Sequence, residues 1–125
     1  MLKRHEICVL VVDDEEGIRE AVSINLEVDG FKVVTASGGD EAIELLKKTK
    51  VDFIISDVRM PKGDGVSLLK YVKEHYPSLP HIVLFSGYAE VNAEEVKKMG
   101  GIDLIAKPPD LDKMVELICK YCIQE

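Results

Sequence analysis

The chain has 125 residues, of which 46% are hydrophobic, and its formal net charge at pH 7 is −7. This length and apolar content predict one domain, spanning residues 1–125, with one hydrophobic core. The acidic excess argues against direct contact of this segment with nucleic acid or an anionic membrane, because phosphate groups attract basic surfaces. The apolar runs fall far short of the ~20 residues that span a membrane, and no signal-peptide pattern opens the chain, so a cytoplasmic location is expected.

The cysteines support that expectation. There are 3, an odd number, which fits a reducing compartment better than a disulfide framework. Cys119 and Cys122 form a C-x-x-C pair at the end of a predicted helix, whereas a redox thiol is favoured at a helix N-terminus. A packing role is therefore predicted for both.

Short apolar runs alternate with amphipathic stretches along the chain, a pattern typical of repeated strand and helix units. Strands are predicted over residues 7–12, 32–36, 53–56, 82–85 and 104–106. The first and fourth of these runs are apolar on both faces, as strands covered by helices on each side must be.

Helical periodicity occupies the intervals between the strands. The first three helices are predicted from the apolar sets Ile18, Ala21, Val22 and Leu26, then Ala42, Ile43 and Leu46, then Val66, Leu69 and Val72 before Pro77. The fourth is predicted over residues 89–99, where apolar anchors are few, and it ends at Gly100 and Gly101. The last begins after an Asp110 N-cap and has a predicted buried stripe of Leu111, Met114, Leu117, Ile118 and Tyr121.

Five such units with right-handed crossovers predict a three-layer α/β fold of the flavodoxin-like type, with a parallel five-stranded sheet of order 2-1-3-4-5. In such a sheet the carboxyl ends of the strands converge on one crevice. Polar residues follow four of the predicted strands, namely Asp13 and Asp14, Asp57, Ser86 and Lys107. We therefore expect these side chains to meet at one edge of the sheet.

Carboxylates gathered in one place repel each other unless a cation joins them. Mg²⁺ is the natural cation, because it takes oxygen ligands from one or two carboxylates together with water and phosphate oxygens. Asp14 and Asp57 can ligate it directly, with Asp13 bonding a coordinated water. Together with Lys107 such an ion would neutralise a phosphoryl group, which predicts Asp57 as a nucleophile that becomes an aspartyl phosphate. The Ser86 hydroxyl can donate a hydrogen bond to a phosphoryl oxygen.

Each of these residues also has an ordinary structural interpretation. Asp13 and Asp14 can cap the first helix, with Glu15 and Glu16 stabilised by its positive end, and Asp57 can initiate the turn that contains Pro61. Ser86 can belong to a turn with Gly87, and Lys107 can be a solvated charge. These independent explanations do not predict that all the residues fall at the same end of different strands, so the joint pattern favours a functional site.

The chain resembles the response-regulator receiver domains of two-component signalling, the CheY-like family, over essentially its whole length. The matching segments are Val-Val-Asp-Asp-Glu at 11–15, Ser-Asp-Val-Arg-Met-Pro-Lys-Gly-Asp-Gly at 56–65, Phe-Ser-Gly at 85–87 and Ala-Lys-Pro at 106–108.

The resemblance implies a role for each matching residue. It implies that Asp57 is the phosphoacceptor, that Asp13 and Asp14 are the acid pair for Mg²⁺, and that the backbone carbonyl of Arg59 completes the metal shell. Ser86 corresponds to the switch hydroxyl and Lys107 to the phosphate-sensing lysine.

The resemblance also implies partners and further details. The phosphoryl donor would be a histidine kinase or histidine phosphotransfer protein, and the target an output domain or protein. The domain would catalyse only its own phosphorylation and dephosphorylation. The Lys107-Pro108 bond would be cis, and Arg59 and Tyr88 would tune hydrolysis of the acyl phosphate.

The chain departs from the family pattern at the expected output face. Leu104 stands where an aromatic residue usually moves inward on phosphorylation, and Pro109 stands where an aromatic is common. The interval from Ser86 to Lys107 is about one residue shorter than usual and contains Gly100 and Gly101. We predict weaker coupling between the site and the strand of Leu104.

Two other classes of function remain as alternatives. One is a phosphorylation-independent interaction module with the same fold. The other is a small-molecule phosphatase that works through an aspartyl phosphate. Phosphatases resembling the haloacid dehalogenases need a second acid two positions after the nucleophile, where this chain has Arg59. The sequence names neither the kinase nor the output, and it leaves open the oligomeric state and whether the native chain continues past Glu125.

Overall fold

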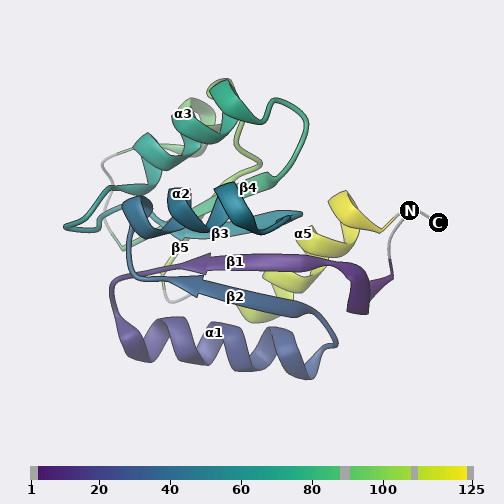
Figure 1. The fold of residues 1–125 in the computed structure, drawn as a ribbon. Helices are drawn as coiled ribbons and strands as arrows, with labels where there is room; N and C mark the ends of the chain where they lie inside the picture. The colour runs from purple at the N-terminus through teal and green to yellow at the C-terminus, as the bar shows by residue number, and fades with distance from the viewer. Residues whose placement is uncertain (1–2, 88–90, 108–109, 124–125) are drawn as a thin grey trace.

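The computed structural model describes residues 3–87, 91–107 and 110–123. A parallel sheet lies between two layers of helices (Figure 1). The elements in chain order are η1 (Arg4–Glu6), β1 (Cys8–Val12), α1 (Glu16–Val28), β2 (Lys32–Ala36), α2 (Gly39–Lys48), β3 (Phe53–Asp57), α3 (Gly65–His75), β4 (His81–Ser86), α4 (Ala93–Lys98), β5 (Leu104–Ala106) and α5 (Leu111–Cys122).

The five strands are parallel and lie in the order β2-β1-β3-β4-β5. This confirms the predicted three-layer, flavodoxin-like fold. In this order β1 and β3 are neighbours, with Val12 opposite Ser56. The residues that follow β1 therefore lie beside the end of β3.

The core is divided by the sheet into two layers, and the central strands contribute to both. Leu10 and Val12 of β1 pack in one cluster with residues of α2, α3 and α4, whereas Val9 and Val11 pack in the other with residues of α1 and α5. Successive residues of a strand point to opposite faces, so a strand between two helical layers is apolar throughout. This explains the continuous apolar run that marks β1 in the sequence.

Two strands extend further than the sequence predicts, and one is shorter. β3 includes Asp57, which pairs with Phe85, and β4 includes Ser86. β1 begins at Cys8 rather than at Ile7, because the Ile7 amide closes the η1 turn by donating to the Arg4 carbonyl at 3.1 Å. Two of the predicted site residues are thus part of the sheet itself, where backbone pairing holds them.

The prediction for the fourth helix is wrong at its start. Residues 91–92 are not helical, and α4 begins at Ala93 after Asn92, whose side chain accepts a hydrogen bond from the Glu95 amide at 2.8 Å. Residues 89–90 of the predicted range lie outside the described residues. The predicted end is confirmed: the Gly101 amide donates to the Val96 carbonyl at 2.9 Å, and Gly100 has a φ of +97°, the left-handed conformation that ends many helices.

The predicted core faces are corrected at two positions. Ala21 of α1 is exposed, and Ser23 is buried instead, because its hydroxyl donates to the Arg19 carbonyl at 2.7 Å and so has a partner. Tyr121 of α5 is 37% exposed and lies beside His81 at the rim, with ring centroids 5.3 Å apart. Met114 and Ile118 are the fully buried residues of that helix.

Cys119 and Cys122 are half-buried in α5 and pack against the cluster that α5 shares with α1. Burial, aided by the charge of Asp52, raises the pKa of the Cys122 thiol to about 11. Because the thiolate is the reactive form, this thiol is protonated and unreactive near neutral pH. The observation agrees with the predicted packing role.

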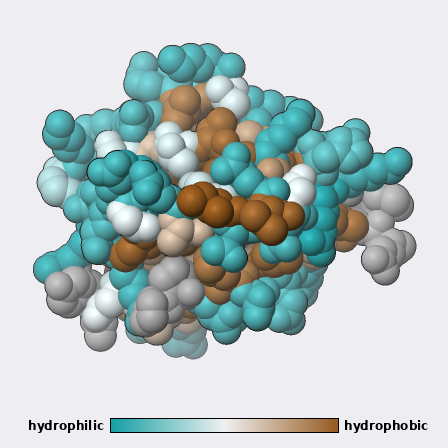
Figure 2. Space-filling model, turned by 90° about the horizontal axis from the view of Figure 1, so that it is seen from below, coloured by the Kyte–Doolittle hydropathy of each residue, from teal (hydrophilic) through white to brown (hydrophobic). Residues whose placement is uncertain are grey.

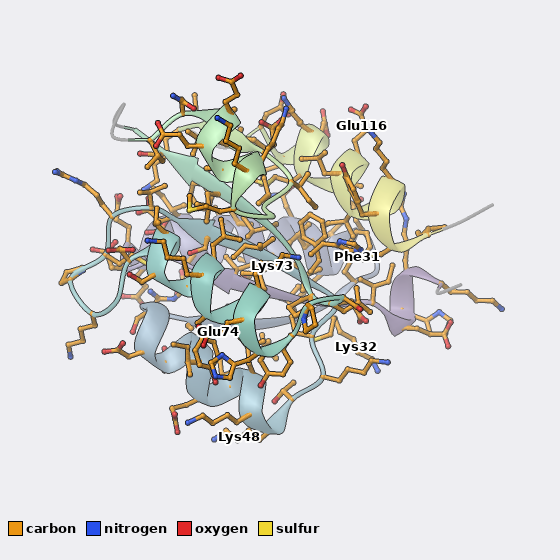
Figure 3. The ribbon with its side chains drawn as sticks, turned by 90° about the horizontal axis from the view of Figure 1, so that it is seen from above. Phe31, Lys32, Lys48, Lys73, Glu74 and Glu116 are labelled. Carbon is orange, nitrogen blue, oxygen red and sulfur yellow. The ribbon has the colours of Figure 1, made fainter. Side chains whose placement is uncertain are left out.

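Apolar residues are also found on the surface of the α1 side, where Figure 2 shows a hydrophobic patch among hydrophilic residues. Ile24 and Val28 of α1 are 59% and 81% exposed. They are four positions apart and so share one face of the helix. Charged side chains such as Lys48 and Glu116 lie at the periphery (Figure 3). In the part of the chain that the structure describes, every helix is too short or too polar to cross a bilayer.

Candidate functional site

The predicted site residues meet at the carboxyl edge of the sheet. Asp57 and Ser86 end β3 and β4, and Lys107 follows β5, with its amide donating to the Ser86 carbonyl at 3.0 Å. A pocket of about 910 Å³ opens at this edge. Its lining includes Asp14, Glu15, Asp57, Arg59 and Lys107. Asp13 and Ser86 are buried.

Asp57 is held at the end of β3 by close backbone packing. The Val58 amide donates to the Phe85 carbonyl at 3.1 Å, and the Gly65 amide donates to the Val58 carbonyl at 2.8 Å. A Cβ at position 65 would lie 2.2 Å from the Asp57 carbonyl oxygen, so only glycine allows α3 to start this close to the strand. The Asp57 side chain forms an ion pair with Lys107, which contradicts the interpretation of Asp57 as a turn residue alone.

The loop that carries Arg59 is fastened to the start of α2. The Gly39 amide donates to the Gly63 carbonyl at 2.8 Å, and the Asp40 amide donates to the Lys62 carbonyl at 3.1 Å. A Cβ on Gly39 would lie 2.8 Å from the Gly63 carbonyl oxygen. Backbone hydrogen bonds between this loop and the first turn of α2 thus limit the positions open to Arg59, which is exposed and lines the pocket.

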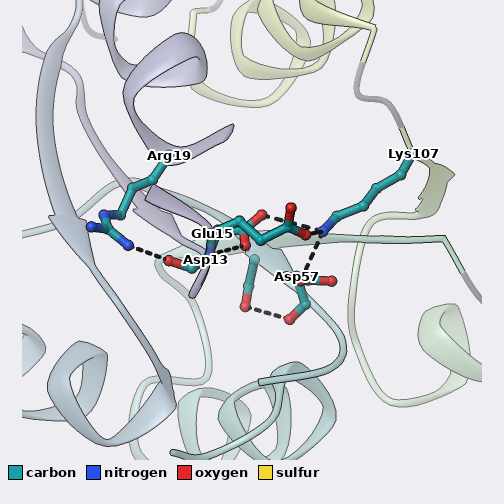
Figure 4. Close-up of polar contacts among 6 residues, drawn as sticks. Asp13, Glu15, Arg19, Asp57 and Lys107 are labelled. Carbon is teal, nitrogen blue, oxygen red and sulfur yellow. Dashed lines mark hydrogen bonds and ion pairs between the residues drawn. The ribbon is translucent and has the colours of Figure 1, made fainter. Parts of the chain in front are cut away.

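Asp13 is fully buried between the loop after β1 and the side chain of Lys107. Its Oδ1 accepts a hydrogen bond from the Glu15 amide at 2.9 Å, and its backbone carbonyl accepts one from Arg19 Nη1 at 2.7 Å (Figure 4). Its Oδ2 is buried and accepts no hydrogen bond. The N-cap of α1 is Glu15, without a side-chain capping bond, so the interpretation of Asp13 and Asp14 as helix caps is wrong.

Lys107 connects the acidic groups. Its Nζ lies 2.9 Å from Asp57 Oδ2, 3.0 Å from Glu15 Oε1 and 3.5 Å from Asp13 Oδ2 (Figure 4). Burial alone would lower the pKa of Lys107, but its hydrogen bonds to Asp57 and Glu15 and the charge of Asp13 outweigh burial and raise it. Lys107 therefore stays protonated at the pocket: it donates hydrogen bonds but does not act as a general acid.

The pKa of Asp13 is also raised. Burial is the main cause, and the charge of Asp57 adds to it, whereas the hydrogen bond from the Glu15 amide and the charge of Lys107 oppose it. The native state therefore holds this carboxylate in its ionised form at a cost.

The three aspartates suit a hard divalent cation. Asp13, Asp14 and Asp57 each offer one oxygen, and these oxygens lie within 4.8 Å of one another. Asp13 Oδ2 has no hydrogen-bond donor although it is buried, and Lys107 alone offsets only part of the negative charge. Carboxylate oxygens are the ligands that Mg²⁺ prefers, so the residues present fit such an ion.

Glu15 has a role in this site that its place in the sequence does not predict. The sequence places it near the positive end of α1, yet its carboxylate accepts a hydrogen bond from Lys107, 92 positions away. The only signal was its place as the third consecutive acid after β1. Tyr88 and the peptide bond to Pro108, both singled out in the sequence, lie outside the described residues.

The fold and the acidic pocket together define a flavodoxin-like α/β domain with a carboxylate and lysine site at the carboxyl edge. The family model of the response regulator receiver domain matches residues 9–119. The chain belongs to this family.

Among the relatives, the regulatory protein AtoC of Escherichia coli K12 is 35% identical over 117 residues, which are 93% of this chain and 25% of AtoC. A putative NtrX-like response regulator of Rickettsia conorii is 33% identical over 120 residues, 94% of this chain and 25% of that protein. The chain thus spans about a quarter of the length of these relatives.

Solved structures show the same fold. A response regulator receiver domain protein from Clostridium thermocellum superposes with a TM-score of 0.84 at 28% identity, covering 92% of this chain and 93% of the other. The receiver domain of NtrX from Brucella abortus gives a TM-score of 0.84 at 27% identity, covering 94% and 99%.

The raised pKa of Asp13 generates a prediction about stability. A carboxyl group whose pKa rises on folding favours the native state at low pH, and this contribution is lost as the pH rises through the native pKa. Asp13→Asn keeps an acceptor for the Glu15 amide and removes the charge. Without Mg²⁺ at pH 7, the variant should therefore have a higher Tm than the parent protein, measured by circular dichroism.

This advantage should shrink at pH values below the ordinary aspartate pKa, and added Mg²⁺ should raise the Tm of the parent more than that of the variant. Asp112→Asn, which removes the same charge from an exposed position on α5, is the control. Equal behaviour of the two variants would contradict the assigned role of Asp13.

Proposed function

We propose that this domain accepts a phosphoryl group on Asp57 in an Mg²⁺-dependent reaction and thereby changes its contacts with an output partner. The observation that carries the proposal is the position of the Asp57 carboxylate, which lies close both to the acid pair Asp13 and Asp14 and to the ammonium group of Lys107. Asp13, Asp14, Asp57 and the backbone carbonyl of Arg59 would hold the ion.

The chemistry follows from these positions. An oxygen of the Asp57 carboxylate attacks the phosphorus of the donor, and the bond from phosphorus to the donor atom breaks. When the donor is a phosphohistidine, the electron pair of the P–N bond returns to the imidazole nitrogen. The product on Asp57 is an acyl phosphate. Mg²⁺, when bound, would neutralise charge on the phosphoryl oxygens.

The remaining residues act on the phosphoryl group once it is present. In the unphosphorylated structure Lys107 donates a hydrogen bond to Asp57 Oδ2, and it can donate this hydrogen bond to a phosphoryl oxygen instead. Ser86, at the end of the neighbouring strand, can donate from its hydroxyl. Movement of Ser86 toward the phosphoryl group would shift the loop that follows, which begins at Gly87.

The donor and target follow from the family. Receiver domains of response regulators interact with histidine kinases and output domains, so we propose a histidine kinase or histidine phosphotransfer protein as the donor. The relatives named above include regulatory proteins about four times as long, and we propose an output domain or protein partner as the target. Substrate turnover, as in a phosphatase, is disfavoured because the exposed Arg59 stands where a second acid is needed.

The nucleophile is tested with a small phosphodonor. Incubation with acetyl phosphate and Mg²⁺ should add one phosphoryl group, seen by intact mass spectrometry, and Asp57→Asn should abolish the addition. Asp52→Asn is the control and should still be phosphorylated, because Asp52 is also buried but lies at the opposite end of β3. Labelling that persists in Asp57→Asn would rule out Asp57 as the acceptor. Absence of labelling in the parent would instead favour the phosphorylation-independent interaction module.

The half-buried Leu104 generates a prediction about the switch. Leucine is smaller than an aromatic ring and has no polar tip, so it has less contact energy to exchange between two conformations. Beryllofluoride, a phosphoryl mimic, should change amide exchange strongly at Ser86 and Gly87 and little at Leu104 and Ile105. Leu104→Tyr should extend the change to β5. Large changes at Leu104 in the parent would show that leucine moves as an aromatic does.

A further inference from the structure

The ammonium group of Lys107 is shared among several carboxylates, and the outermost of these belongs to Glu15. Lys107 donates hydrogen bonds to Asp57 at 2.9 Å and to Glu15 at 3.0 Å, and its distance of 3.5 Å to Asp13 is an ion pair without a hydrogen bond (Figure 4). The Glu15 side chain is 60% exposed, whereas that of Lys107 is 16% exposed. Glu15 thus approaches a largely buried cation from the solvent side.

This contact differs from an ordinary surface ion pair. Lys47 and Glu44 also pair at 2.9 Å, but both side chains are mostly exposed, at 56% and 67%, and either can swing into solvent. Such exposed ion pairs contribute little to the stability of the folded protein. Lys107 is held by buried groups on its other side, so the loss of Glu15 would free one donor without releasing the lysine from the pocket.

The donor that Glu15 occupies is one that a phosphoryl group on Asp57 would need. A phosphoryl group brings two negative charges and strong acceptor oxygens into a pocket that already contains more carboxylates than cations. The Glu15 carboxylate would both repel that group and retain the ammonium group that neutralises it.

We propose that Glu15 is a positioning residue that holds Lys107 in the unphosphorylated state and competes with the phosphoryl oxygens for its ammonium group. Glu15 thereby lowers the occupancy of the phosphorylated state and makes it more easily reversed. This inference rests on the proposed function, because it requires a phosphoryl group on Asp57.

The chain offers a matched control in the next residue. Glu16 carries the same charge and is exposed at the start of the same helix, but among the described residues Lys107 pairs with Asp13, Glu15 and Asp57 and not with Glu16. Glu15→Gln and Glu16→Gln therefore remove equal charge from adjacent exposed positions. Only the first removes an ion pair with Lys107, because an uncharged amide oxygen then replaces the Glu15 carboxylate.

The experiment measures the affinity of beryllofluoride for the parent and both variants by calorimetry. Each protein is measured at its own saturating Mg²⁺ concentration, so that a change in metal affinity does not alter the measured affinity for beryllofluoride. Glu15→Gln should bind beryllofluoride about two- to fivefold more tightly than the parent, which is the range expected when one partner of a partly exposed pair is removed. Glu16→Gln should stay close to the parent.

A second readout reports on Lys107 itself. The side-chain ammonium resonance of Lys107 in the protein without beryllofluoride should shift in Glu15→Gln and stay unchanged in Glu16→Gln, because of these two glutamates Glu15 is the one that accepts a hydrogen bond from Lys107. A purely structural role of Glu15 would change the Tm without changing this resonance or the affinity.

Equal beryllofluoride affinity in parent and Glu15→Gln, or weaker binding in the variant, would overturn the competition while leaving the proposed function intact. Failure of the parent to bind beryllofluoride at all would sink the proposed function, and the inference with it. The two failures are therefore distinguishable in one series of titrations.

Discussion

The structure of the site depends on one largely buried cation among carboxylates. Lys107 contacts Asp13, Glu15 and Asp57 within 3.5 Å, and each of these contacts crosses from one strand end or loop to another. Without that ammonium group, burial of Asp13 and Asp57 at adjacent strand ends would leave two close like charges largely shielded from water. The arrangement places three carboxylates that could hold a divalent cation beside an ammonium group.

The sheet supplies the geometry that makes this concentration of charge possible. Parallel pairing sets Val12 opposite Ser56 and Asp57 opposite Phe85, so the charged residues are carried to one edge by backbone hydrogen bonds. The glycine at position 65 lets α3 begin against the Asp57 carbonyl, where any side chain would collide. The side chains of the site are therefore positioned by the strands and by a few close backbone contacts.

Much of this was predictable from the sequence, because strand ends in a parallel sheet obey a simple rule. The apolar runs indicated the strands, and the residues immediately after them indicated the pocket. With the strand order that is common for five such units, the fold and the proximity of Asp13, Asp57 and Lys107 could be predicted. The predicted start of α4 was wrong. Glu and Lys residues favour helix over a wide range, and the sequence pattern did not indicate that Asn92 is the N-cap.

The positions that were missed depend on side-chain hydrogen bonds, one of them local and the other long-range. Ser23 is buried because a carbonyl four residues earlier accepts its hydroxyl hydrogen, and Glu15 bonds Lys107 across 92 positions of chain. A hydropathy pattern records neither contact, since serine and glutamate are polar residues and are expected to be exposed. Long-range pairing of this kind is visible only when the loops are placed in space.

The central claim is that Asp57 becomes a phosphoryl site whose charge is shared between a metal ion and Lys107. A crystal structure of the domain with Mg²⁺ and beryllofluoride tests it most directly. The account predicts beryllofluoride on the Asp57 carboxylate, a divalent ion ligated by Asp57 and Asp14, and Lys107 Nζ within hydrogen-bond distance of a fluoride. Beryllofluoride on another residue, or a metal ion bound away from these aspartates, would contradict it.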